Sequence, residues 1–161
     1  MILAILNRQR TKKIDARRLR HIVQELLTEL SLESAELGIN LVGEREMTLL
    51  NETFLRHGGS TDVIAFNHGP LADCDPSAET RLHGELFVCV DEAIIQARRF
   101  RSTWQTEIVR YIVHGILHLL GHDDRKAAAR RRMKREESRW LHRLAAKNSF
   151  AQLSRTVKIR A

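Results

Sequence analysis

Three histidines within nine residues are the strongest chemical signal in this sequence. His114, His118 and His122 lie in the stretch HGILHLLGHDD, which ends with the carboxylates Asp123 and Asp124. Residues four positions apart on a helix leave the same face one turn apart, so His114 and His118 have the spacing that two ligands of one metal ion need. A third ligand would come from beyond the turn after the helix. The pattern therefore predicts a metal site at a helix end.

Two alternatives to a catalytic metal site stay open at this point. Two histidines one turn apart can also flank an apolar core, although the adjoining Gly-His-Asp-Asp favours a metal by adding three potential ligands. A metalloprotease helix of the HExxH type carries a glutamate directly after its first histidine, where this chain has Gly115, so proteolysis is only an alternative. Structural roles are favoured for the other histidines, which are scattered: His21, His57, His68, His83 and His142.

The composition predicts one globular domain over residues 1–161. The chain is 43% hydrophobic and 29% charged, which excludes a disordered polymer and a membrane protein. Its N-terminus is apolar first and basic afterwards, the reverse of a secretory signal. Cys74 and Cys89 lie fifteen positions apart without a CxxC spacing, so we expect two ordinary thiols in a reducing cytoplasm.

The positive charge is concentrated at the C-terminal end. The formal net charge is +7, but residues 125–161 hold 13 Lys or Arg against two acidic residues, and residues 1–124 are net negative. A basic segment of this kind indicates either a binding surface for a polyanion or a solvated helix face. Charge alone does not separate the two.

Periodicity along the chain predicts an α+β fold, with a small mixed sheet of about four strands and helices packed on it. The helix with the His-x-x-x-His pair resembles that of zincins. We expect strands over 1–6, 38–42, 61–66 and 84–90, and a loop over 67–82. Helices are expected over 15–30, 44–54, 91–100, 103–121 and 124–146, the first capped by Asp15 and the fourth beginning near Thr103.

The stretch HGILHLLGHDD resembles the signature HGxLHLxGxDH of the YbeY-type endoribonucleases, the bacterial rRNA maturation factors. Other blocks of this family occur in the same order and spacing and cover most of residues 44–137: Leu50–Phe54, Thr61–Phe66, Gly84–Val88, Gln96–Ala97, and Met133 with Glu136 or Glu137. The resemblance implies a metal-dependent, single-strand-specific endoribonuclease that acts in 16S rRNA 3′-end maturation and ribosome quality control. Its partners would be rRNA and the small-subunit precursor, with no membrane involved.

The resemblance also implies one Zn²⁺ ion held by three histidines, of which His114 and His118 carry over directly. The family's third histidine falls at Asp124, which we expect to be the third ligand because a carboxylate is an accepted zinc donor. His122 is the alternative if the helix continues through Gly121. A carboxylate in place of an imidazole would reduce the net charge of the centre and favour harder cations, so another divalent metal is possible.

The remaining assignments concern the loop before the third strand and the basic residues. The family has an arginine where this chain has Leu55. Arg56, one position later, is either the catalytic candidate that contacts the phosphate beside His114 or an exposed loop arginine without a role in the reaction. For Asp62 and Glu85 we expect structural roles. Basic residues on either side of the metal helix would contact RNA phosphates without reading sequence: Arg98, Arg99, Arg101 and those within 130–135. The alternatives are a peptidase and a non-enzymatic ribosome-assembly factor with a structural metal.

Overall fold

The computed structural model describes residues 1–69 and 81–155, and it confirms the α+β class with a mixed sheet. Within these residues four strands pair in the order β1-β2-β4-β3. The β1–β2 and β2–β4 pairs are parallel and the β4–β3 pair is antiparallel, so β1 and β3 are the two edges. The strands are β1 (Ile2–Asn7), β2 (Ser34–Val42), β3 (Val63–Asn67) and β4 (Arg81–Cys89).

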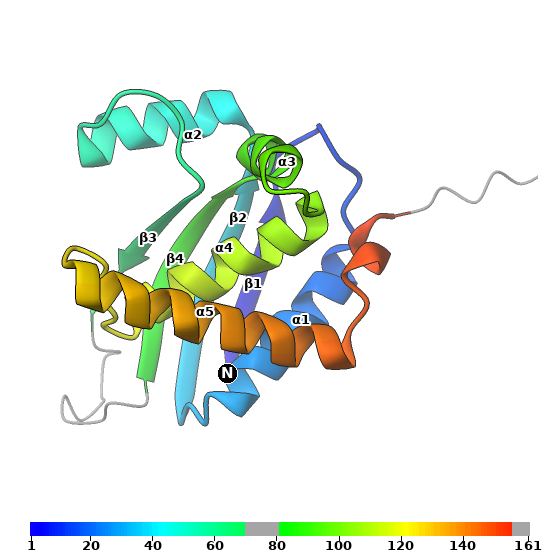
Figure 1. The fold of residues 1–161 in the computed structure, drawn as a ribbon, viewed down its shortest axis with the longest axis vertical. Coiled ribbons are helices and arrows are strands. Elements are labelled where there is room, and N and C mark those ends of the chain that lie inside the picture. Colours follow the sequence, from blue (N-terminus) through cyan, green and yellow to red (C-terminus); the bar gives the residue numbers. More distant parts are fainter. Residues whose placement is uncertain (70–80, 156–161) are drawn as a thin grey trace, which may run out of the picture.

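Helices pack on one face of the sheet, with α4 and α5 crossing in front of it and α1 beside them (Figure 1). The opposite face holds a smaller cluster in which Met47 of α2 packs on Val42, Ile64 and Cys89. The helices are α1 (Ala16–Glu29), α2 (Glu44–Leu50), α3 (Val90–Arg99), α4 (Trp104–Leu119) and α5 (Ala127–Lys147), with a π-helical turn η1 (Asn51–Leu55) and a 3-10 turn η2 (Phe150–Leu153).

The expected caps at Asp15 and Thr103 are found in the structure, whereas α5 begins at Ala127 and not at residue 124. Asp15 caps α1, where its carboxylate accepts hydrogen bonds from the backbone N–H groups of Arg17 and Arg18, both at 3.1 Å. Thr103 caps α4 by accepting from the N–H of Thr106 at 3.2 Å. Each cap satisfies donors that the first helical turn leaves without a partner.

The structure corrects several expected boundaries. Asn67 and residues 81–83, which we expected in a loop, belong to β3 and β4, because β4 extends back to pair with the first residues of β2. Strand β2 likewise begins at Ser34 instead of residue 38. Helix α4 ends at Leu119 and not at Gly121, which has the positive φ of 94° that glycine adopts easily. Cys74 and most of the predicted loop lie outside the described residues.

Helix α4 is fixed against the sheet by a close approach at Gly115. A Cβ at this position would lie 2.7 Å from Cδ2 of Leu86, a fully buried residue of β4, and 3.2 Å from Cγ2 of Val63 in β3. A side chain at this position would force the buried Leu86 side chain or the helix itself to shift. The apolar side of α4, with Ile108, Ile112 and other buried residues, faces the sheet and leaves the opposite side for polar residues.

None of the helices in the described parts of the chain is long and apolar enough to span a membrane.

Substituting Gly115 by alanine tests this close approach. The substitution improves helix propensity by about 1 kcal/mol, but forcing a methyl group into a closed core typically costs about 1–3 kcal/mol. We expect Gly115→Ala to lower the free energy of unfolding by about 1 kcal/mol, as measured by urea denaturation. Gly58→Ala is the matched control, because a Cβ at Gly58 would have no atom within 4 Å, and stabilisation by Gly115→Ala would contradict this account.

Candidate metal centre

Helix α4 presents His114 and His118 side by side on its polar face. Their ring centroids are 4.6 Å apart and their Nε2 atoms face each other at 3.1 Å. Both side chains are partly buried, with exposed fractions of 24% and 31%. The predicted spacing thus brings two imidazole nitrogens to one point.

The turn after α4 brings Asp124 back to the same point. Oδ2 of Asp124 lies 3.5 Å from Nε2 of His118 and 3.9 Å from Nε2 of His114. These three residues form the one group among the described residues whose potential ligand atoms could hold a metal ion together. Because α4 ends before Gly121, His122 does not continue the helix face, and its side chain is exposed and outside this group.

The hydrogen bonds of the two imidazoles fit metal binding. Nδ1 of His114 donates to the Glu137 carboxylate at 2.9 Å, and Nδ1 of His118 donates to the backbone carbonyl of His122 at 3.1 Å. A neutral imidazole carries one proton, so these contacts leave both Nε2 atoms as acceptors. Two lone pairs and a carboxylate oxygen directed at one point require a proton or a cation between them. The donor set of two nitrogens and one oxygen suits Zn²⁺ and other divalent ions.

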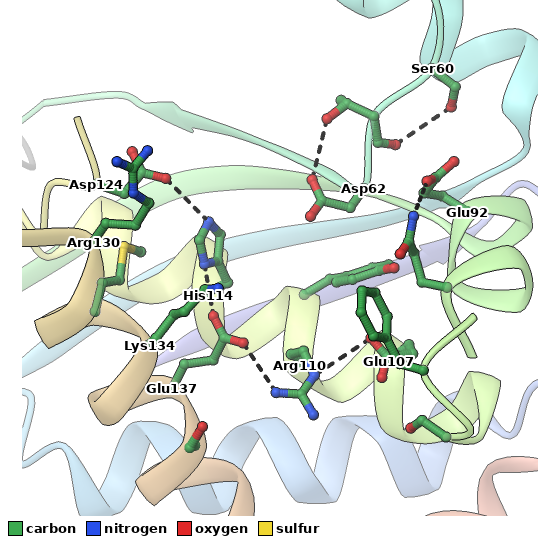
Figure 2. Close-up of a pocket in the computed structure, with 17 residues that line it drawn as sticks. Ser60, Asp62, Glu92, Glu107, Arg110, His114, Asp124, Arg130, Lys134 and Glu137 are labelled. Atoms are coloured by element: carbon green, nitrogen blue, oxygen red, sulfur yellow. Dashed lines mark hydrogen bonds and ion pairs between the residues drawn. The ribbon is translucent and has the colours of Figure 1, made fainter. Parts of the chain in front are cut away.

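A buried carboxylate network on α4 and α5 supports His114 (Figure 2). Glu137 of α5 is only 9% exposed and also lies 3.3 Å from the guanidinium of Arg110. Arg110 in turn lies 3.5 Å from Glu107, which is 4% exposed. A carboxylate that holds the second nitrogen of a ligating histidine fixes its tautomer and its orientation. Glu137 therefore positions His114.

The sequence analysis assigned no role to Glu137 or Arg110. For Glu137, however, the sequence of α5 does contain an indication of its role. Glu137 stands within the apolar stripe of this helix, between Met133 and Trp140, where an uncharged side chain would be expected. A carboxylate inside such a stripe must have a buried partner. The position of Glu137 in the stripe is thus a sign, readable in the sequence, that this residue contacts a charged or polar group in the core.

Opposing effects act on the pKa of His114. Burial lowers this pKa, but the hydrogen bond with Glu137 and the negative charges of Glu137, Asp62 and Asp124 raise it by more, so the net shift is upward. The ring therefore keeps a second proton to a higher pH than a free histidine does. A metal ion and this proton compete for Nε2, and the competition weakens as the pH rises through the pKa of His114.

A cavity of about 750 Å³ opens beside the histidines. Asp124 and His114 lie at one end with Arg130 and Lys134 of α5, and the cavity runs along the polar face of α4 towards α3. Asp62, which precedes β3, forms part of the wall. Its carboxylate accepts a hydrogen bond from the backbone N–H of Val63 at 2.7 Å, a contact consistent with the structural role we predicted.

The structure does not bring the other candidate residues into this cavity. Arg56 is exposed at the end of η1, in a left-handed conformation with φ 53°, and does not line the cavity. Glu85 accepts a hydrogen bond from Asn40 at 2.8 Å within the sheet. The exposed residues Arg98, Arg99 and Arg101 also lie outside the lining.

Comparisons with known proteins show which proteins this chain is similar to. The family model described as Endoribonuclease YbeY matches residues 4–145. A protein of that name from Salinibacter ruber is 31% identical over 134 residues, which are 82% of this chain and 85% of that protein. Another from Anaeromyxobacter is 38% identical over 76% of this chain but only 62% of its own length. The solution structure of TM1509 from Thermotoga maritima shares the fold, with a TM-score of 0.67, 24% identity and 99% of both chains covered.

Metal analysis of two variants tests which residue is the third ligand. We expect Asp124→Ala to weaken binding of Zn²⁺ by about 100-fold or more, which exceeds the usual effect of losing an outer contact. His122→Ala should bind the metal almost normally, because alanine keeps the backbone carbonyl that His118 contacts. Both affinities are measured by competition with a chromogenic chelator. Full metal binding by Asp124→Ala would refute this assignment.

Two neighbouring glutamates on α5 provide a matched test of the support for His114. Glu137→Gln removes the charge between His114 and Arg110, and we expect zinc affinity to fall by about 10–100-fold. Glu136→Gln removes only a surface ion pair with Arg139, so its zinc affinity should stay within about twofold. Titration of His114 by NMR should show a lower pKa in metal-free Glu137→Gln. Equal affinities in the two variants would contradict the role of Glu137.

Proposed function

This chain belongs to the YbeY endoribonuclease family, and from that premise we propose that it is a metal-dependent endoribonuclease that cuts single-stranded RNA. The biological task in this proposal is 3′-end maturation of 16S rRNA together with ribosome quality control, carried out on the small-subunit precursor in the cytoplasm. Residues 1–161 act as a single catalytic domain with a basic segment over 125–161.

The facing Nε2 atoms of His114 and His118, with Asp124 beside them at one end of a cavity, carry this proposal. Three protein ligands leave coordination positions for water and substrate, whereas a structural zinc site is closed by four. When bound, a divalent ion such as Zn²⁺ supplies Lewis acidity towards a phosphodiester and lowers the pKa of coordinated water. The three-residue group favours catalysis over a purely structural metal.

The residues around this group have separate tasks in the proposed reaction. Glu137 keeps the His114 ring oriented, and Arg110 neutralises Glu137, so neither is available to bind substrate. Arg130 and Lys134 are exposed and line the cavity next to Asp124, where they would contact the phosphate groups on either side of the scissile bond. These two cations fit that task better than the predicted Arg56, which lies outside the cavity.

The charge of α5 supports an RNA substrate over a peptide. Arg130, Arg131 and Arg132 follow one another near the start of this helix and are all exposed, shortly after the turn that holds Asp124. Such a cluster attracts a polyanion and makes binding strongly salt-dependent. A peptidase has no general use for this surface, and the position after His114 holds Gly115 and not the glutamate of HExxH enzymes.

Cleavage of a labelled single-stranded RNA tests the proposed function. Zinc-loaded protein should cut the RNA, and His114→Ala should lower the rate by at least about 100-fold because it removes a metal ligand. His21→Ala, on the exposed surface of α1, is the matched control and should leave the rate unchanged. Arg56→Gln and Arg130→Gln are compared in the same assay, where we expect the larger loss for Arg130→Gln.

Three outcomes would count against this function. Equal rates for the unmodified protein and His114→Ala would identify the activity as a contaminating nuclease. Cleavage of unstructured peptides without cleavage of RNA would favour the peptidase. Binding of precursor RNA by zinc-loaded protein without any cleavage would favour a non-enzymatic assembly factor.

A further inference from the structure

The two ends of the cavity differ in charge. Figure 2 shows Asp124, Arg130 and Lys134 around the histidine end, whereas Glu92 and Glu107 lie at the far end. Arg110 is the only cation between the two ends among the described residues that line the cavity. It is paired with Glu107 and Glu137. Phosphate therefore suits the histidine end and is repelled from the far end.

Glu92 and Gln96 place two hydrogen-bond acceptors at the far end. The side-chain amide of Gln96 donates to Oε1 of Glu92 at 2.8 Å, and both residues are partly buried on α3. This bond orients the amide so that its carbonyl oxygen, like Oε2 of Glu92, still has accepting capacity. A ligand that fits here must offer donors, such as N–H groups, and carry no negative charge.

Tyr111 supplies a second, independent sign of a binding site. Tyr111 is 4% exposed and lines the cavity, and its hydroxyl has no hydrogen-bond partner among the described residues. Burial, followed by the negative charges of Asp62, Glu107 and Glu92, raises the pKa of this hydroxyl, so it stays protonated. A buried hydroxyl without a partner is unfavourable, and a polar ligand or an ordered water would satisfy it.

We propose that the far end of the cavity binds the base of a nucleotide next to the scissile phosphate, and that it prefers bases with an exocyclic amino group to uracil. This inference rests on the proposed function. Cytosine, adenine and guanine each carry an amino donor, and a glutamate accepting from the amino group of cytosine is a known mode of base recognition. Uracil has no amino group: its corresponding edge offers only the N3–H donor between two carbonyl oxygens, and the O4 oxygen would face the oxygens of Glu92 and Gln96 where cytosine places its amino donor.

The dimensions and the apolar wall of the cavity fit a nucleotide. His114 and Glu107 are seven residues apart on α4, which corresponds to about 10 Å along the helix axis. A nucleotide can span this distance from its phosphate to the outer edge of its base. Phe100 also lines the far end and is 66% exposed, with the guanidinium of Arg99 5.5 Å from its ring centroid. An exposed aromatic ring of this kind is a stacking surface for a base.

Binding of mononucleotides to zinc-loaded protein tests this inference without any cleavage. Calorimetric titrations with 3′-CMP, 3′-UMP and their 5′ isomers measure the discrimination between bases on either side of the phosphate. We expect one CMP isomer to bind about tenfold more tightly than the matching UMP. Glu92→Gln should reduce this ratio to about one or two, because a glutamine amide can also donate to the O4 carbonyl of uracil.

A glutamate outside the cavity provides the control. Glu36→Gln removes an exposed carboxylate of β2 and should keep the tenfold ratio. Equal affinities of the unmodified protein for CMP and UMP would overturn the inference even if Glu92→Gln failed to fold, as would an unchanged ratio in a folded Glu92→Gln. RNA cleavage without base discrimination contradicts only this inference, whereas base discrimination without RNA cleavage contradicts only the proposed function.

Discussion

The hydrogen bond between His114 and the buried carboxylate of Glu137 is the contact on which the candidate site depends. It joins α4 to α5 on either side of the turn that carries Asp124, and so it sets where that carboxylate lies relative to the two imidazoles. A carboxylate buried as deeply as Glu137 is unfavourable unless it is paired. His114 and Arg110 satisfy it together, and removing either would leave negative charge in the core between the helices.

Sequence patterns predicted the parts of the fold that depend on contacts between residues close together in the sequence. The cap at Asp15 and the ends of α1 depend on contacts within a single helical turn, and the structure reproduces them. The start of β4 could not be predicted in this way. Arg81 is part of a strand because it pairs with Ser34 of β2, 47 positions earlier, and neither residue has a strong preference for strands. Pairing across the sheet, not local propensity, extends both strands.

The same distinction between local contacts and contacts of distant residues applies to the candidate site. The proximity of His114 and His118 follows from helix geometry alone, so their spacing in the sequence was sufficient to predict it. The sequence matched Asp124 to the position of the family's third histidine. The alternative ligand, His122, depended on whether the helix continued past Gly121. The positive φ of Gly121 is incompatible with such a continuation. Contacts made by Glu137 join two helices, and spacing does not identify the partner of a buried carboxylate. Arg56 lies at the end of the irregular turn η1 and outside the cavity lining, so its contact with a phosphate stays a prediction.

The charge of the cavity explains why metal and RNA would bind together in the proposed function. Five carboxylates and three cations are among the described residues that line it, so without an ion its wall is net negative. A divalent cation at His114, His118 and Asp124 would balance that difference and let a phosphate approach. In the proposed function, the exposed Arg130, Arg131 and Arg132 near the start of α5 would attract RNA to this part of the surface. Access of a phosphate to the cavity would then depend on a metal held by His114, His118 and Asp124, so the same three residues would determine where the strand enters and where it is cut.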